Sequence, residues 1–364
     1  AGVGGIYNYP CASITFDDVL ENNATIENDG IIHANGNLFT NTGTFLQSET
    51  GIIFDPNNIF DSPGGTFTDN GNTLPNNQTN STTNIWTGCA DDLDWDTPEN
   101  WSLEEEPQVD YDVIITDITG GSNSPNVYTT GNVAQSIEVE NGATLSIDLV
   151  GELTIDNSNE NGIENQGTIT NSGVLNVSNS TNNDINNTGT FNNNSCAEMT
   201  LTGQIISSNN FSNNGLLTTT FNGTNTITGT FTNNGVINDS FDSFNQGTDI
   251  VNNGIIILPI TGCLGGSISD ALLGENPNLI VDVDWEHKVS ASVGGTYNSA
   301  NNTWTPDNTS IGVGTHTLDL VIEDVAASCN IITSIEVEIE NCIQTWTGAS
   351  SPPNTDWNDP TNWS

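Results

Sequence analysis

A short repeat dominates the sequence: two apolar residues flank an asparagine and a glycine in the order φ-x-N-x-G-x-φ, where φ is Ile, Leu or Phe. Asn and Gly adopt left-handed backbone angles more easily than other residues, so each copy predicts two short strands joined by a tight turn. The flanking apolar side chains would then point into one shared interior. The copies lie at Ile26–Ile32, Phe39–Phe45, Ile163–Ile169, Ile169–Leu175, Ile185–Phe191, Phe211–Leu217, Phe231–Ile237 and Ile250–Ile256.

The repeat is compatible with two architectures. Asn-Gly turns are a strong signal for hairpins, so a string of antiparallel hairpins is one interpretation. The spacing favours another, because Gly215, Gly235 and Gly254 follow one another at intervals of 20 and 19 residues, each before two apolar residues. A near-constant period of about 20 residues is typical of a solenoid whose coils stack, with asparagines at equivalent turns able to form amide ladders. We expect a parallel β-solenoid.

The charge of the chain excludes several classes of function. The 364 residues include 46 acidic side chains and a single cation, Lys288, which gives a net charge of −45. Nucleic-acid binding needs cations that displace phosphate counterions, and anionic membrane surfaces repel such a chain. No apolar run reaches the roughly 18 residues of a membrane span, so membrane insertion is not expected. No stretch shows capped helical periodicity, and the sequence therefore predicts an all-β protein.

The cysteines point to an oxidising compartment. Their number is even, and neither a CxxC pair nor a Cys/His cluster with zinc spacing occurs. We therefore expect disulfide bonds and an extracellular location. The chain starts at Ala1 without an apolar signal segment, which fits a processed or excised piece. The six cysteines are Cys11, Cys89, Cys196, Cys263, Cys329 and Cys342.

A second, longer repeat carries most of the tryptophans. Its common core is DWxxPxNWS, preceded by Trp-Thr-Gly, and its two copies start 260 residues apart. Two Trp residues six positions apart around a proline predict a compact apolar clamp on a loop. The favoured interpretation is a cap over the open end of a solenoid, and the alternative is an aromatic platform for carbohydrate. The tryptophans are Trp86, Trp95 and Trp101 in the first copy and Trp346, Trp357 and Trp363 in the second.

This Trp segment and the stretches after it resemble modules of very large surface proteins of Bacteroidota. The resemblance rests on the WTG…DWxxPxNWS segment together with 110–115, 125–128 and 136–145, and it covers about Trp86–Ile257. Those proteins look like adhesins exported by type IX secretion, in which such a segment opens a β-solenoid. The resemblance implies an architecture, and it implies no ligand.

A third region resembles the immunoglobulin-like or PKD-like modules of the same proteins. The resemblance rests on 294–297, 304–306 and 312–320. Period-two alternation at 318–323 and 335–340 independently predicts strands with one buried and one solvated face. If the strands follow the usual order of such modules, Cys263 and Cys329 lie near the same pole, and we expect a disulfide between them.

These observations predict five segments. Residues 1–83 form an N-terminal solenoid, 84–102 a Trp-rich cap or linker, 103–262 the main solenoid, 263–342 an Ig-like or PKD-like sandwich, and 343–364 a second Trp-rich segment. The first segment looks like a solenoid without its Trp segment, and the last like a Trp segment without its solenoid. Two explanations are open: the chain is a window of a longer tandem protein, or the tail of one subunit caps the head of the next in a filament.

Calcium is the best ligand hypothesis. Four carboxylates, Asp91, Asp92, Asp94 and Asp96, crowd beside Trp95, and a hard cation with oxygen ligands would relieve their repulsion. The spacing is not that of an EF-hand, and a solvated acidic loop is the alternative. Catalytic motifs are absent, and with one cation the chain lacks the parts of a polyuronate lyase. A two-carboxylate glycosidase remains a remote alternative.

The sequence as a whole therefore predicts a non-enzymatic, extracellular structural or adhesive fibre protein of the cell surface. We expect it to be elongated and to partner with itself head to tail or with further modules of the same chain. The large negative charge would keep such fibres soluble and mutually repelling. The alternative is an adhesin module that binds glycans through calcium or exposed tryptophan.

Overall fold

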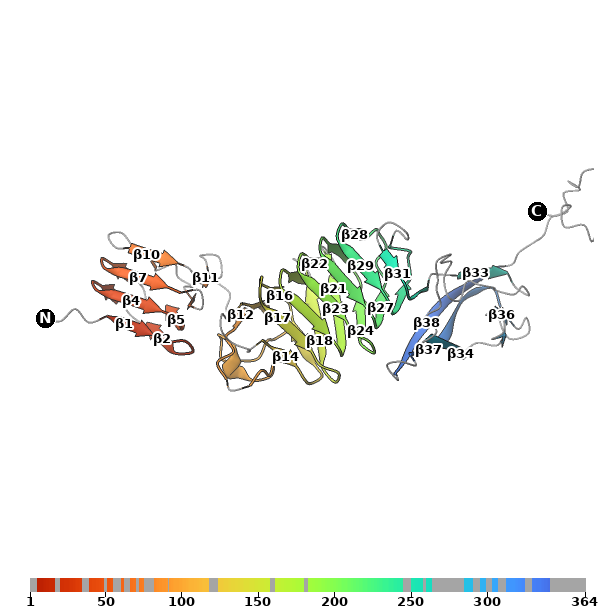
Figure 1. Ribbon diagram of the computed structural model, residues 1–364, viewed down its shortest axis with the longest axis horizontal. Coiled ribbons are helices and arrows are strands. Elements are labelled where there is room, and N and C mark those ends of the chain that lie inside the picture. The colour runs from red at the N-terminus through yellow and green to blue at the C-terminus, as the bar shows by residue number, and fades with distance from the viewer. Residues whose placement is uncertain are drawn as a thin grey trace, which may run out of the picture.

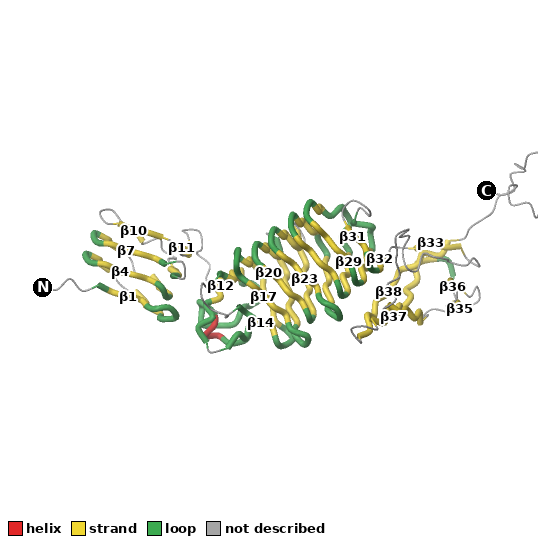
Figure 2. The backbone as a smooth tube through the Cα atoms, viewed as in Figure 1, coloured by secondary structure: helices red, strands yellow, loops and turns green. Residues whose placement is uncertain are grey.

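The structure is a computed structural model of the 364-residue chain. It describes residues 5–16, 20–34, 39–48, 51–54, 60–61, 66–69, 72–74, 82–90, 92–117, 124–157, 161–179, 183–244, 250–257, 260–263, 285–290, 295–298, 303–306, 312–324 and 329–340. Within these ranges the chain forms β-strands and one short 3-10 helix, η1 (Pro98–Asn100), and no α-helix (Figures 1 and 2). The expected all-β fold is confirmed.

The N-terminal strands form a parallel solenoid of three sheets (Figure 1). Each coil contributes one strand to each sheet in turn, and all the described pairs between coils are parallel. Sheet A contains β1 (Ile6–Asn8), β4 (Thr25–Asn28), β7 (Thr44–Gln47) and β10 (Thr66–Asp69); sheet B contains β2 (Ser13–Phe16), β5 (Ile31–Ala34), β8 (Ile52–Phe54) and β11 (Asn72–Leu74); sheet C contains β3 (Leu20–Asn22), β6 (Phe39–Asn41) and β9 (Phe60–Asp61).

A longer parallel solenoid follows, also with three sheets, and the hairpin alternative is wrong. Sheet D contains β12 (Thr83–Trp86), β13 (Asp112–Ile115), β16 (Ser136–Val139), β19 (Ile163–Asn165), β22 (Asn183–Asn187), β25 (Gln204–Ser207) and β28 (Thr226–Ile227). Sheet E contains β14 (Asn126–Val127), β17 (Thr144–Ile147), β20 (Thr168–Asn171), β23 (Thr190–Asn193), β26 (Asn210–Asn213), β29 (Thr230–Asn233) and β31 (Ile250–Asn252). Sheet F contains β15 (Asn132–Ala134), β18 (Glu152–Asn157), β21 (Val174–Asn179), β24 (Glu198–Leu201), β27 (Leu216–Thr219), β30 (Val236–Asp239) and β32 (Ile255–Ile257).

The short repeat is the corner between two strands of one coil. Its first apolar residue belongs to the strand before the corner and its last to the strand after it, as Ile163 of β19 in sheet D and Ile169 of β20 in sheet E do. The apolar residues point inward and form a continuous core through the main solenoid. Within that core Phe191, Phe211 and Phe231 stack on successive coils with ring centroids 4.7 and 4.6 Å apart.

The asparagine of the repeat lies inside the corner and bonds along the stack. In the longest ladder, each side-chain Nδ2 donates to the Oδ1 of the next coil over 2.7–2.8 Å. Each also donates to a backbone carbonyl of that coil, for example Asn213 to Val236 at 3.1 Å. The side-chain amides of Asn171, Asn193, Asn213 and Asn233 each donate twice to the next coil, and these bonds fix the register of the five coils that they join. The ladder consists of Asn171, Asn193, Asn213, Asn233 and Asn252.

The glycine of the repeat has a different role from the one expected. None of the repeat's described asparagines or glycines has a positive φ, so the prediction of left-handed turns is wrong. A Cβ on Gly235 would lie 2.2 Å from the carbonyl oxygen of Gly215, and one on Gly254 would lie 2.1 Å from that of Gly235. Glycine is therefore required because the coils approach too closely for a side chain.

The C-terminal strands form two further sheets. In sheet G, β37 (Gly314–Asp324) and β38 (Cys329–Glu340) make a long antiparallel pair, β34 (Trp285–Ser290) pairs antiparallel with β37, and β33 (Ile260–Cys263) pairs parallel with β38. A two-stranded sheet joins β35 (Gly295–Asn298) to β36 (Thr303–Pro306). The expected alternation is present where side chains are described, because Val337 and Ile339 are buried and their neighbours exposed. The described strands do not show an Ig-like sandwich.

Two expected boundaries differ from the structure. Strand β12 already belongs to sheet D, so the Trp-rich segment is an insertion within the first part of the main solenoid and not a linker before it. At the other end the last solenoid strand is β32, and the expected boundary at 262 falls inside β33 of sheet G. The second Trp-rich segment, 343–364, lies outside the described residues. In the described part of the chain, no helix is both long and apolar enough to cross a membrane.

Candidate functional site

The Trp-rich cap, which we define as residues 87–111, leaves the core after β12 and returns at β13. Two of its segments complete exposed strand edges. Trp101 bridges antiparallel to Trp86 of β12, and Asp94 bridges parallel to Asn126 of β14. The backbone N–H of Trp95 donates to the carbonyl of Asn126 at 3.0 Å, and that of Ser102 donates to Ile85 at 2.9 Å. The cap therefore covers the first strands of sheets D and E, which would otherwise offer unpaired edges.

The three tryptophans of the first copy form one packed cluster. Each is 1% exposed and belongs to the core of the main solenoid. Trp101 packs edge-to-face against Trp86 at 5.0 Å and against Trp95 at 4.8 Å between ring centroids. Its indole Nε1–H donates to the carbonyl of Trp95 at 2.7 Å. No indole face of these three residues is open to a sugar ring, so they close the core and do not form a platform.

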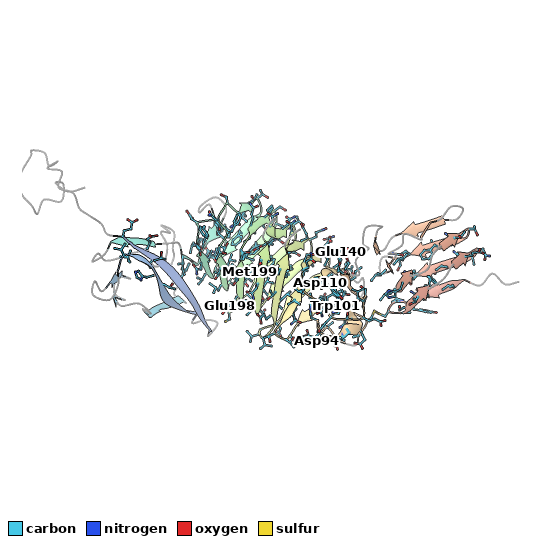
Figure 3. The ribbon with its side chains drawn as sticks, turned by 180° about the vertical axis from the view of Figure 1, so that it is seen from behind. Asp94, Trp101, Asp110, Glu140, Glu198 and Met199 are labelled. Atoms are coloured by element: carbon cyan, nitrogen blue, oxygen red, sulfur yellow. A yellow bond between two sulfur atoms is a disulfide. The ribbon has the colours of Figure 1, made fainter. Side chains whose placement is uncertain are left out.

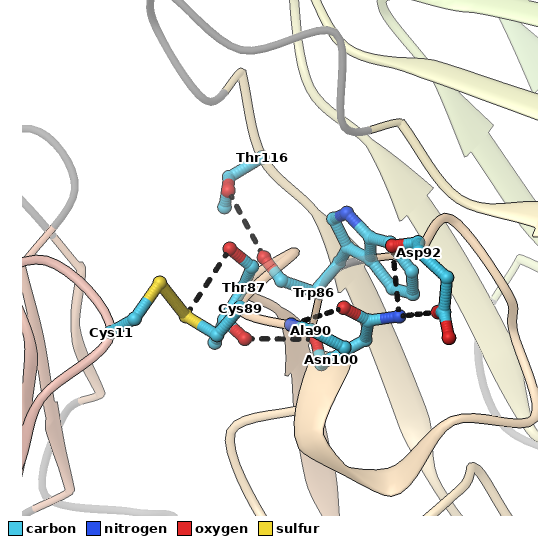
Figure 4. The surroundings of a disulfide bond; sticks show 8 residues. All are labelled: Cys11, Trp86, Thr87, Cys89, Ala90, Asp92, Asn100 and Thr116. Carbon is cyan, nitrogen blue, oxygen red and sulfur yellow. Dashed lines mark hydrogen bonds between the residues drawn. A yellow bond between two sulfur atoms is a disulfide. The ribbon is translucent and has the colours of Figure 1, made fainter.

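Asn100 organises the cap from its buried centre. Its Oδ1 accepts from the N–H of Ala90 at 2.8 Å, and its Nδ2 donates to Oδ1 of Asp92 at 2.9 Å. Its carbonyl accepts from both the N–H and the hydroxyl of Thr87 (Figure 4). Asn100 is not among the site residues predicted from the sequence, although the NWS shared by the two Trp segments contains it.

The carboxylates of the predicted calcium site accept hydrogen bonds, most of them from other residues of the cap. Asp92 accepts from the N–H of Asp94, from Thr97 and from Asn100, and the backbone bond from Asp94 is the largest cause that lowers its pKa. Asp94 accepts from the N–H of Asp96, and the carboxylate of Asp96 accepts from Thr129. Among the described residues, no group of three or more His, Cys, Asp or Glu side chains lies in a position to hold a metal ion. Asp91 lies outside those residues, and calcium binding stays a prediction.

The same cap joins the two solenoids. Cys89 of the cap forms a disulfide with Cys11 of the N-terminal solenoid, with 5.2 Å between their Cα atoms (Figure 4). Beside it, the outward side chains Ile31 and Ile52 of sheet B cluster with Ile85 of β12, and Ile114 packs against them. Because Ile31 and Ile52 belong to adjacent coils, the N-terminal solenoid contacts the main one through the side of its stack and not through its end.

A patch of acidic side chains lies on the outer face of sheet D. Glu138 of β16 and Glu164 of β19 are register partners on adjacent strands. Glu140, labelled in Figure 3, directly follows β16. Burial is the largest cause that raises the pKa of both Glu138 and Glu140, and neighbouring carboxylates add to it. This arrangement concentrates negative charge where it is half desolvated, at a cost in stability.

The remaining predicted residues are only partly described. Cys196 is in a disulfide bond. The side chains of Cys263 and Cys329 lie outside the described residues, as do Trp346, Trp357 and Trp363, so the predicted Cys263–Cys329 bridge is not tested. The Cys11–Cys89 pair was missed because nothing in the spacing of six cysteines selects one of the 15 pairings.

Comparisons of the chain with protein families, with curated proteins and with solved structures find no match.

Proposed function

We propose that this chain is a stiff structural module of an extracellular surface fibre, with no catalytic role. The observation that carries the proposal is the buried ladder of asparagine amides, which links five successive coils of a solenoid whose first coil is covered by the Trp-rich cap. Hydrogen bonds in such a dry chain polarise one another. These hydrogen bonds between coils resist sliding of one coil over the next, which a module that carries tension or acts as a spacer requires. The 46 acidic residues keep neighbouring fibres apart, and the disulfide suits an oxidising exterior.

Single-molecule pulling on the full chain tests the mechanical role. We expect the main solenoid to unfold at high force, and Asn213→Ala to lower that force because it removes a buried amide bonded to both neighbouring coils. Asn214→Ala is the matched control, since the Asn214 side chain bonds on the outer surface. Equal unfolding forces for both variants, or unfolding of the native chain at forces typical of helical domains, would contradict the proposal.

We further propose that the chain joins copies of itself, or further modules of the same protein, end to end. In the described part of the chain β1 pairs only with β4, so one edge of the first coil is open to a partner. The segment 343–364 repeats the sequence of the cap, and the cap covers such edges in the main solenoid. Electron microscopy of the native material should show filaments or long multi-module chains, and Trp363→Ala should shorten the filaments. Isolated single particles at all concentrations would contradict this.

Glycan binding is the second candidate function, and its aromatic platform differs from the one expected. Tyr7 and Tyr9 are 42% and 66% exposed, with ring centroids 4.5 Å apart. Exposed Tyr rings with a polar tip suit a sugar face. A glycan array, run with calcium and again after chelation, should show binding that Tyr9→Ala abolishes. Unchanged glycan binding in that variant would contradict a binding site at these two tyrosines.

For the C-terminal sheets we propose an Ig-like or PKD-like module. The long antiparallel pair of β37 and β38, with its alternation at Val337 and Ile339, supports this fold. A crystal structure of the full chain should show the two-stranded sheet of β35 and β36 packed face to face on sheet G.

A further inference from the structure

The outer face of sheet E carries a regular array of short polar side chains. On each of five successive strands, two outward residues flank one inward residue, and their registers align from coil to coil. The inward residues are buried, whereas the outward ones are partly or fully exposed. One column consists of Thr144, Thr168, Thr190, Asn210 and Thr230; the other consists of Ser146, Thr170, Asn192, Ser212 and Thr232.

The array is periodic in two directions. Adjacent strands repeat every 4.7–4.9 Å or so, and residues two apart on one strand are separated by roughly 6.6–6.8 Å. Threonine is stiff about χ1, so its hydroxyl and methyl groups keep fixed positions on such a backbone. The result is a grid of ten polar side chains.

Regular stacks of side chains inside the solenoid support this grid. Directly beneath it, the rings of Phe191 and Phe211 are parallel within 1° and those of Phe211 and Phe231 within 7°. The asparagine ladder runs under the same strands. Flat sheets over many strands are unusual and need stacking or side-chain ladders of this kind. The rings of these three residues keep nearly the same orientation from coil to coil, as a stack of coils with little twist requires.

The composition of the face excludes most partners. All ten residues are Thr, Ser or Asn, although about one residue in eight of the chain is acidic. The other sheets differ: sheet F has Glu152, Val174 and Glu198 in one outward column, and sheet D has the Glu138–Glu164 pair. Without charge the sheet E face does not attract ions or basic proteins, and without apolar or aromatic groups it does not suit a protein core or a sugar platform.

A ligand that uses all ten positions must itself be uncharged and periodic in two directions. Ice fits this chemistry, because its surface is uncharged, repeats in two directions, and every surface oxygen donates or accepts hydrogen bonds. Many weak contacts then add up at once, since the grid is already rigid and pays little ordering entropy. Crystalline polysaccharide is also periodic, but its flat sugar faces are recognised by aromatic rings, which this face lacks.

We propose that the outer face of sheet E is a binding site for the surface of ice crystals. The inference goes beyond the structural role proposed above and does not depend on it. A surface fibre with such a face would attach its bearer to ice or restrain the growth of ice beside it.

Ice-affinity partitioning tests the proposal. The fluorescently labelled full chain is exposed to a slowly growing ice hemisphere, with labelled serum albumin as the non-binding reference. We expect the chain to be enriched in the ice. The variant Thr168→Tyr/Thr190→Tyr places two bulky rings on the grid and should reduce its incorporation to the level of albumin. Thr200→Tyr is the matched control, because Thr200 is an exposed outward residue of sheet F beside Glu198, and it should partition like the native chain.

The outcomes are separable. Circular dichroism melting shows whether each variant keeps its fold, and microscopy of ice crystal shape in the native protein gives a reading that needs no variant. Native chain excluded from ice, with unmodified crystal shape, overturns the proposal. An equal loss of incorporation into ice in the sheet E variant and in the sheet F variant overturns it as well. Binding to microcrystalline chitin or cellulose that the sheet E variant abolishes, in the absence of ice binding, would assign the face to polysaccharide instead.

Discussion

At the scale of single residues, the corner asparagine and glycine of the repeat together hold adjacent coils in close contact. Glycine lets adjacent coils approach until a Cβ would overlap a carbonyl oxygen, and the buried amide of asparagine then bridges the short gap. Either residue alone would fail, because the amide needs the close approach and the close approach leaves backbone groups that need partners. The repeat contains both residues because this packing requires both.

Gly235 is the position at which this requirement is most directly testable. Gly235→Ala would place a methyl group 2.2 Å from the carbonyl oxygen of Gly215, which is backbone and cannot move without separating the coils. We expect the free energy of unfolding to fall by about 1–3 kcal/mol, as overpacking does elsewhere. Denaturant titration measures it. Gly312→Ala is the control, since a Cβ there meets nothing within 4 Å and should leave stability unchanged. A similar loss in both variants would contradict the packing argument.

The half-buried carboxylates of sheet D predict how stability depends on pH. Burial and Glu164 raise the pKa of Glu138 above its ordinary value of 4.5, so the folded state binds its proton more tightly than the unfolded state. Stability from this group is fully present below the unfolded pKa and is lost as pH rises through the folded pKa. We therefore expect the melting temperature to rise as pH falls through the raised pKa of Glu138 towards the unfolded value of 4.5.

Glu138→Gln isolates the contribution of this carboxylate from that of the total charge. It should melt higher than the native chain at pH 7 and show a weaker dependence on pH. Glu198→Gln removes one exposed charge on sheet F and serves as the reference. If both variants shift the melting curve equally, net charge and not the local burial of Glu138 is responsible.

At the scale of elements, the cap shows what an inserted loop must do for a solenoid. Its backbone pairs with the edges of β12 and β14, while its indoles close the core beneath. Trp101 links both functions, because its ring touches Trp86 and Trp95 and its N–H bonds the carbonyl of Trp95.

Truncation of Trp101 should therefore open the end of the main solenoid. For Trp101→Ala we expect a loss of about 3–5 kcal/mol, as for other buried tryptophans, and binding of a hydrophobic dye at the exposed core. Trp101→Phe keeps an aromatic ring but removes the indole hydrogen bond, so its free energy of unfolding should fall by less than that of Trp101→Ala. Hydrogen exchange then locates the effect, which should be largest in β12 and β13. Unchanged exchange in those strands would show that the cap does not protect them.

The strands of the solenoid could be predicted from the sequence where a residue type serves a single structural purpose. The 19- and 20-residue spacing of Gly215, Gly235 and Gly254 specified the stacking of coils, and Leu216, Val236 and Ile255 indeed pair in register. The role of glycine was misjudged, because close approach and left-handed geometry favour the same residue and only the distance to Gly215 separates them. The insertion of the cap after β12 was missed because Thr83–Trp86 lacks the repeat and its pairing with β13 spans the whole cap.

At the scale of the whole molecule, the junction between the solenoids decides whether the chain acts as one body. The N-terminal solenoid meets the main one through a side-on apolar contact and one disulfide. Figure 1 shows the two stacks beside each other, with β5 near β12. The contact is small, since it consists of Ile31, Ile52 and Ile85 with Ile114 beside them. A covalent link is therefore needed to keep a load on one solenoid from separating it from the other.

The disulfide also shapes the stability of the N-terminal solenoid. Cys11 and Cys89 are 78 residues apart, and closing a loop of that length lowers the entropy of the unfolded chain, which stabilises the fold by roughly 4.5 kcal/mol. We expect Cys11→Ser/Cys89→Ser to speed amide exchange in β4, β5 and β7 while β20, β23 and β26 keep the native rate, since their ladder and core are independent of the bond. The double variant is preferable to a reductant, which would also reduce the disulfide of Cys196. Equal acceleration in both solenoids would mean that they fold as one cooperative unit, and unchanged exchange in both would mean that the apolar contact alone holds the junction.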